Sequence, residues 1–104
     1  MRFHHVGVPT TERQDAENYL EGNDLYVTGP ETSDHRIEWL RFGPNCPMPE
    51  ELKTSPHIAF EVDDLKEALK GKDLLIEPFE PMPGLRVAFV KDGDFPVEYM
   101  QVLR

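Results

Sequence analysis

The stretch His57-Ile58-Ala59-Phe60-Glu61-Val62-Asp63-Asp64-Leu65 decides the fold. It starts with apolar and β-branched residues, which predict a strand over residues 57–62. Asp64 with Glu67 three positions later is a capping box, and it predicts a helix that ends at Gly71. The stretch therefore indicates a strand that leads directly into a capped helix.

The same pattern occurs earlier in the chain. Phe3-His4-His5-Val6-Gly7-Val8 returns as Ser55-Pro56-His57-Ile58-Ala59-Phe60, and Ile37-Glu38-Trp39-Leu40 returns as Val97-Glu98-Tyr99-Met100. Each half therefore contains one His and one Glu at matching places. A repeat with a metal-ligand residue type at the same place in each copy suggests two half-sites that together enclose one metal ion.

The elements around these residues are expected to repeat as well. Residues 2–8 read as a strand ended by Pro9, and Thr11 with Gln14 predicts a capped helix that stops at Gly22. Further strands are expected at 24–28, 36–42, 74–79, 86–91 and 97–103. The distance from His to Glu is 33 residues in the first copy and 41 in the second, so a trimmed hairpin is expected in the first copy.

A proline-rich stretch separates the two copies. Residues 43–56 contain four prolines, which predict a connector without helix or central strand. We therefore expect one domain of 104 residues, with a first module at about 1–43, a connector at 43–56 and a second module at about 56–104.

Composition narrows the possible partners. The chain has 11 Lys and Arg against 20 Asp and Glu, a net charge of −9, which disfavours binding to nucleic acid or to anionic membranes. There is no apolar run of membrane-spanning length and no signal-peptide pattern, so a cytoplasmic protein is expected. The single cysteine, Cys46, excludes an intrachain disulfide and a cysteine-based zinc site.

Strand alternation indicates where the repeated residues point. His5 shares a strand face with Gly7, and His57 shares one with Ala59, so each histidine has a very small neighbour and room for a ligand. The neighbouring apolar residues point to the opposite faces, which helices are expected to cover. Glu38 and Glu98 stand on otherwise apolar strand faces, where an unpaired carboxylate is costly.

Two imidazoles and two carboxylates suit a borderline divalent ion such as Zn²⁺, Ni²⁺, Co²⁺, Mn²⁺ or Fe²⁺. Such an ion can polarise a carbonyl while a nearby glutamate moves a proton at the adjacent carbon. Proton transfer next to a carbonyl is therefore the chemistry expected of this set.

Ordinary explanations exist for the same residue types. A strand glutamate is often simply exposed, Glu61 is a rival carboxylate on the face of His57, and His35 reads as a solvated turn residue. Arg41 and Arg86 could bind a substrate carboxylate or phosphate, although a salt bridge is the commoner role. Cys46 has no base nearby in the sequence and reads as a bystander.

With these motifs the whole chain resembles the glyoxalase/bleomycin-resistance/dioxygenase family, the vicinal oxygen chelate superfamily. The residues that carry the resemblance are His-Val-Gly-Val at 5–8, Ile-Glu-Trp-Leu-Arg-Phe at 37–42, His-Ile-Ala-Phe-Glu-Val-Asp-Asp-Leu at 57–65 and Val-Glu-Tyr-Met at 97–100. The resemblance implies an α+β fold of paired βαβββ modules that form a curved mixed sheet around a metal or ligand cavity, here with a shortened first module. It also implies a homodimer, which the open sheet edges favour independently.

Carried over by position, the resemblance implies that His5, Glu38, His57 and Glu98 bind the metal, and that a glutamate, Glu38 or Glu98, carries the proton. The function expected is a lyase or isomerase of glyoxalase I-like type acting on a small α-hydroxy or α-keto compound or thioester. The alternative is a protein of the same fold that sequesters a small molecule without catalysis. The sequence has no clear equivalent of glutathione-binding residues, so the substrate stays open.

Overall fold

Two groups of contacting residues make up the chain in the computed structural model, which describes residues 1–104. The first half is His5–Pro56, and the second half is His57–Arg104 together with Met1–His4. Both contain parallel and antiparallel strand pairs and only short helices, which confirms the α+β class.

The elements alternate as short strands and helical turns, with η marking a 3₁₀ helix. From the N-terminus they are β1 (Arg2–Pro9), β2 (Asn18–Leu20), η1 (Glu21–Asn23), β3 (Leu25–Val27), η2 (Pro30–Thr32), β4 (Ile37–Phe42) and α1 (Glu50–Thr54). They continue with β5 (His57–Glu61), α2 (Leu65–Ala68), β6 (Asp73–Met82), β7 (Leu85–Asp92) and β8 (Phe95–Val102).

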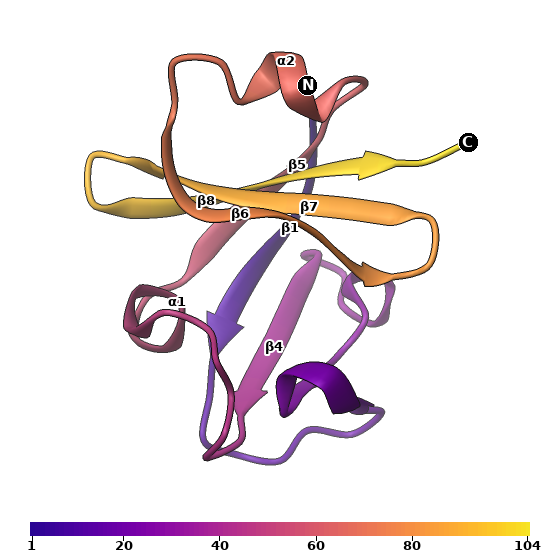
Figure 1. The fold of residues 1–104 in the computed structure, drawn as a ribbon. Coiled ribbons are helices and arrows are strands. Elements are labelled where there is room, and N and C mark those ends of the chain that lie inside the picture. Colours follow the sequence, from indigo (N-terminus) through magenta and orange to yellow (C-terminus); the bar gives the residue numbers. More distant parts are fainter. The chain divides into compact units, whose positions relative to one another are not determined.

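The first half has the strand order β2-β3-β4-β1. Strands β1 and β4, which are labelled in Figure 1, are parallel. Gly7 of β1 lies opposite Glu38 of β4. Strands β2 and β3 are three residues long each, so the expected shortening of this module is confirmed. All four strands of a βαβββ module are nevertheless present, because the hairpin is trimmed rather than deleted.

The helix predicted from Thr11 to Gly22 is wrong. The backbone turns instead at Ala16, which has a left-handed φ of 59° that no right-handed helix can contain. Side chains replace the helical bonds, since the Gln14 N–H donates to the Glu17 carboxylate and the Glu12 N–H donates to Thr10 Oγ1. The capping signal at Thr11 was therefore a false one, and the segment up to β2 is irregular.

The second half has the strand order β5-β8-β7-β6, in which β5 and β8 are parallel. Ala59 of β5 lies opposite Glu98 of β8, the same register as Gly7 and Glu38 in the first half. Here the predicted helix is confirmed: the Asp64 side chain accepts from the Glu67 N–H at 3.3 Å and caps α2.

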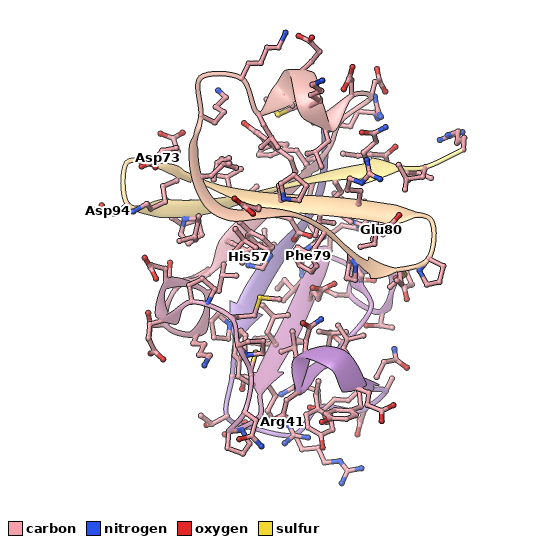
Figure 2. All side chains as sticks on the ribbon, viewed as in Figure 1. Arg41, His57, Asp73, Phe79, Glu80 and Asp94 are labelled. Carbon is pink, nitrogen blue, oxygen red and sulfur yellow. The ribbon has the colours of Figure 1, made fainter.

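The two faces of the second half have different roles. Helix α2 lies over one face of the β7–β8 pair (Figure 1). On that face Leu65 packs in a buried cluster with Ala88 and Tyr99. Residues at alternate positions point to the other face, and Figure 2 shows the labelled His57 and Phe79 there. The expectation that the apolar face lies under a helix is thus confirmed for this half.

The connector contains a helix that the sequence reading excluded. Helix α1 occupies Glu50–Thr54, between Pro49 and Pro56, with Leu52 buried. The prediction failed because prolines only disrupt a helix from inside, and Pro49 stands in front of the first turn, where the missing N–H is not needed. Five residues free of proline are enough for one helical turn.

None of the helices in the structure has both the length and the apolar character needed to cross a bilayer.

Candidate functional site

A histidine and a glutamate lie side by side in the second half. His57 begins β5 and is 2% exposed, while Glu98 lies in the middle of β8 and is 8% exposed. Because β5 and β8 are parallel with Ala59 opposite Glu98, both side chains leave the same face, and His57 Nε2 lies 3.1 Å from Glu98 Oε1.

Packing holds this pair in place. Phe89 of β7 lies opposite Glu98 and meets the His57 ring edge to face, with the ring centroids 5.2 Å apart. Sequence reasoning missed Phe89, although its position is detectable, because it follows from alternation once β7 is paired with β8.

The first half repeats the arrangement with small differences. His5 is 2% exposed, and its Nε2 lies 3.6 Å from Glu38 Oε1, the Glu38 side chain being 20% exposed. Gly7 lies opposite Glu38, as Ala59 lies opposite Glu98. The structure thus brings together each His–Glu pair that the repeat predicted.

The pairs have the chemistry of a metal half-site. Two donor atoms bound to one ion at 2.0–2.2 Å, in tetrahedral or octahedral angles, lie roughly 2.8–3.6 Å apart. The nitrogen-to-oxygen distances of 3.1 Å and 3.6 Å fall in that range. His5, His57 and Glu98 are each buried, and each is of a residue type that binds metal ions. The donor set therefore fits a borderline divalent cation.

The other predicted candidates lie elsewhere. Glu61, the rival carboxylate, pairs with the Arg2 guanidinium at 3.1 Å. His35 is an exposed turn residue, as expected. Cys46 is buried in a small apolar cluster with Leu25 and Leu40, which agrees with a packing role.

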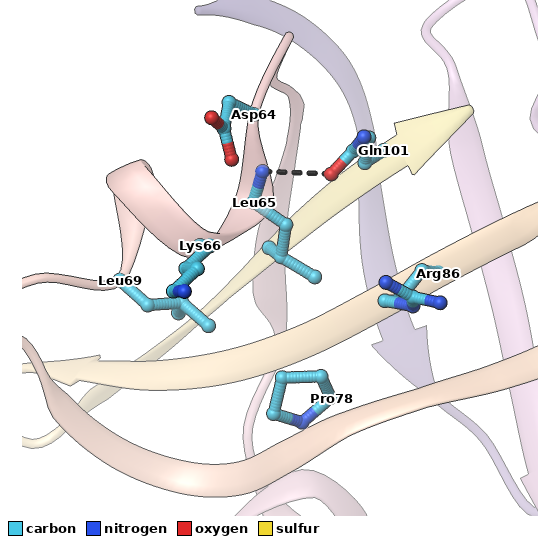
Figure 3. A pocket seen from close by; sticks show the side chains of 7 residues that line it. All are labelled: Asp64, Leu65, Lys66, Leu69, Pro78, Arg86 and Gln101. Atoms are coloured by element: carbon cyan, nitrogen blue, oxygen red, sulfur yellow. Dashed lines mark hydrogen bonds between the residues drawn. The ribbon is translucent and has the colours of Figure 1, made fainter. Parts of the chain in front are cut away.

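Arg86 lies on β7, in register with Gln101 of β8, beside a hollow under α2 (Figure 3). Alternation along β7 places Arg86 on the face opposite to Phe89, and Phe89 is the residue that contacts His57. Arg86 is therefore on the other side of the half-sheet from the His57–Glu98 pair.

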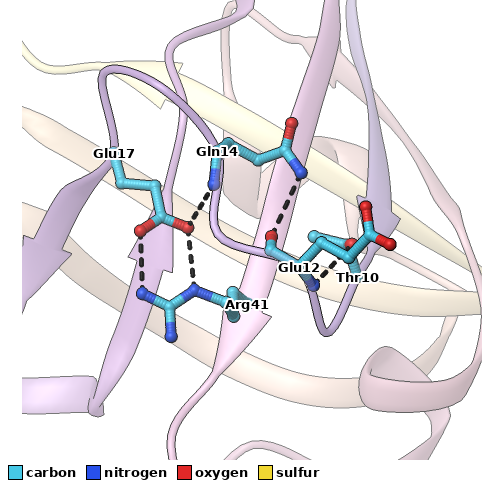
Figure 4. Close-up of polar contacts among 5 residues, drawn as sticks. All are labelled: Thr10, Glu12, Gln14, Glu17 and Arg41. Carbon is cyan, nitrogen blue, oxygen red and sulfur yellow. Dashed lines mark hydrogen bonds and ion pairs between the residues drawn. The ribbon is translucent and has the colours of Figure 1, made fainter.

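Arg41 is engaged by a carboxylate. Its Nε and Nη2 donate to Glu17 at 2.9 Å and 2.8 Å (Figure 4). Its guanidinium also lies 4.0 Å from the centroid of the Tyr26 ring. The hydrogen bond from Arg41 lowers the pKa of the Glu17 carboxyl to about 2, and the Gln14 N–H acts in the same direction. Arg41 also lies on the face of β4 opposite to Glu38.

Comparison with known proteins shows the fold. No family model and no curated protein matches the sequence. Among solved structures, a hypothetical protein from Bacillus halodurans C-125 is similar with a TM-score of 0.75 and 17% identity, over 99% of this chain and 95% of that one. A methylmalonyl-CoA epimerase from Mycobacterium tuberculosis is similar with a TM-score of 0.66 and 16% identity, over 99% of this chain and 89% of that one. This chain shares its fold with both proteins.

Proposed function

We propose that this protein is a metal-dependent lyase or isomerase that transfers a proton next to a carbonyl of a small substrate. The observation that carries the proposal is the repeated His–Glu pair at one strand register in both halves. A structural histidine needs one hydrogen-bond partner, but nothing in packing requires a buried histidine to lie beside a glutamate twice at the same register.

In this proposal His5, Glu38, His57 and Glu98 bind one divalent ion. Two carboxylates offset the charge of a dication, which lowers the cost of holding the ion at a buried position. When bound, the ion supplies Lewis-acid polarisation of that carbonyl.

The two glutamates have different environments, and this suggests different tasks. Glu98 is nearly buried against Phe89, whereas Glu38 is more exposed and lies farther from its histidine. A proton carrier must reach a substrate carbon, so Glu38 is the better candidate for that role and Glu98 for holding the ion. Arg41 and Arg86 are left out of the proposal because both lie on the strand faces opposite to the pairs.

The epimerase among the structural neighbours supports the reaction class. Epimerisation next to a carbonyl proceeds by removal and return of a proton, which is the step proposed here. Its substrate is not carried over, because 16% identity leaves the substrate contacts undetermined. A small-molecule substrate and a homodimer remain predictions.

Metal content and proton exchange test the proposal. Protein purified without added metal, and protein reconstituted with Zn²⁺, Ni²⁺ or Co²⁺, is expected to contain close to one ion per chain by elemental analysis. His57→Ala and Glu98→Gln should weaken metal binding by more than about 100-fold, since even loss of groups that only orient ligands costs 10–100-fold. Glu61→Gln is the matched control on the same strand and should bind as the wild type does.

Activity is measured as deuterium uptake from D₂O into hemithioacetals, acyl-CoA esters and hydroxy acids. Glu38→Gln should slow exchange by about 100-fold or more while it retains part of the metal affinity. If no near-stoichiometric metal is found and His57→Ala leaves the titration curves unchanged, the proposal is wrong. A non-catalytic binding protein of the same fold would then be the better description.

A further inference from the structure

A hollow of about 340 Å³ lies between α2 and the strands β6, β7 and β8 of the second half (Figure 3). Its apolar walls come from Leu65, Leu69 and Pro78, and Lys66, Arg86 and Gln101 supply polar groups. This size lies at the small end of ligand pockets, so it suits a small molecule.

The hollow is separate from the His57–Glu98 pair. Arg86 and Gln101 lie opposite each other in the β7–β8 register and share the face covered by α2 with Ala88 and Tyr99. Phe89 and Glu98, also opposite each other, point to the other face. The two candidate sites thus use opposite faces of the same two strands.

The cations at the hollow are unpaired in an acidic protein. Arg86 and Lys66 make no hydrogen bond or ion pair in the structure, although the chain carries a net charge of −9. Arg2, Arg41 and Lys70 pair with carboxylates, whereas Lys72 and Lys91 are unpaired as well but do not line the hollow. Arg86 and Lys66 are both exposed, and together they place two positive charges beside the apolar walls of one hollow, an arrangement that suits an anion with an apolar part.

The other polar groups of the hollow, Gln101 and Asp64, form hydrogen bonds with backbone N–H groups of the chain and not with Arg86 or Lys66. Gln101 Oε1 accepts from the Leu65 N–H at 2.8 Å, so its amide N–H groups remain as donors. The Asp64 carboxylate at the rim accepts from the Glu67 N–H as the cap of α2. Two cations and one carboxylate therefore line the hollow, and the carboxylate is the one that caps α2.

A second hollow, in the first half of the chain, is a weaker candidate for an anion-binding site. It measures about 500 Å³ and has Arg41 and Lys53 in its walls. Arg41 is bound by Glu17 on two atoms, and Lys53 Nζ donates to the Cys46 carbonyl at 2.9 Å. Its cations are thus already satisfied within the chain.

We propose that the hollow under α2 binds a small organic anion. Its carboxylate or phosphate head is held by Arg86 and Lys66, and its short apolar chain lies against Leu65, Leu69 and Pro78. Arg86 provides a planar pair of donors for the head group, which a lysine alone cannot provide.

Titration of the ¹⁵N-labelled full chain with hexyl phosphate, hexanoate and neutral hexanol tests this. At least one of the two anions should cause saturable shifts at the backbone amides of Leu65, Lys66, Arg86 and Gln101, with Kd of roughly millimolar order for a ligand of this size. The head group that saturates first identifies the class, and hexanol should not saturate.

Variants decide whether the cations carry the binding. Arg86→Gln should raise Kd by about tenfold or more, as expected for loss of a charged hydrogen bond. Lys72→Gln removes the same charge outside the hollow and should leave Kd unchanged, and so should Glu98→Gln, which separates this site from the proposed metal site. Shifts that do not saturate, that are unaffected by Arg86→Gln, or that centre on His57 and Glu98 would overturn the proposal.

Discussion

The two halves of the chain share a parallel strand pair and differ in almost everything around it. Strands β1 and β4 match β5 and β8, and the residue opposite each glutamate is small in both halves. The second half adds a capped helix and strands of eight to ten residues, whereas the first has no helix between β1 and β2, and its hairpin strands have three residues.

This difference shows which part of a half positions the His–Glu pair. The pair survives loss of the helix and trimming of the hairpin, so its geometry depends on the parallel ladder. The ladder of hydrogen bonds fixes the register, and the register fixes which residues share a face. The helix contributes instead to burial of the opposite face, where the second half has its larger apolar cluster.

The largest difference that we expect between the two halves is in how much a buried leucine contributes to stability. Leu65→Ala should lower the free energy of unfolding by about 3–4 kcal/mol, and Leu25→Ala by about 2 kcal/mol, because Leu65 is more deeply buried and belongs to the larger cluster. Urea denaturation followed by circular dichroism measures both. Equal losses, or a larger loss for Leu25→Ala, would mean that the helix adds no extra burial. A single transition in the wild type would support the one-domain prediction.

A smaller contrast is expected at the two capping signals. Asp64→Ala removes a side chain that accepts from the Glu67 N–H, and it should cost about 1 kcal/mol. Thr11→Ala changes the equivalent residue in the first half, where no helix exists, and it should stay within about 0.5 kcal/mol. The same urea titration compares them. A cost at Thr11 equal to that at Asp64 would indicate that the first half forms its missing helix in solution.

The smallest difference that we expect between the two halves is in how stability changes at low pH. The folded pKa of Glu17, about 2, lies below the unfolded value of roughly 4.3, so the unfolded chain binds more protons between these values. The stability that this carboxylate adds is therefore complete above roughly pH 4.3 and is lost as the pH falls through about 2.

Glu17→Gln should flatten that part of the stability profile, measured by thermal unfolding between pH 2 and 5. Glu61→Gln is the matched control, because Glu61 pairs with the more exposed Arg2 and should change the profile less. A profile for Glu17→Gln that follows the wild type would show that the Arg41 pair does not contribute.

The second half was largely predictable from the sequence, because its local signals agree with its tertiary structure. The cap at Asp64 and the strand patterns indicated the elements that form. The His–Glu pairs were predictable as well, since the repeat aligned them without any knowledge of the fold.

The first half was less predictable, because long-range contacts override its local signals. Thr11 and Gln14 have the pattern of a cap, but the Gln14 N–H bonds to Glu17, whose carboxylate also binds Arg41 24 residues away. No local pattern reports such a contact. The helix in the connector was missed for another reason, since proline content was counted without regard to where each proline stands relative to the turn.

The irregular segment between Pro9 and β2 has a practical consequence. Its counterpart in the second half holds an entire helix, yet the β1–β4 register of the first half is the same as the β5–β8 register of the second. The β1–β4 register does not require a helix at this point, so the part of the segment ahead of the Gln14–Glu17 bond is a natural place to insert a peptide tag or a reporter sequence. An engineer could lengthen it by several residues and expect β1 and β4 to keep their alignment.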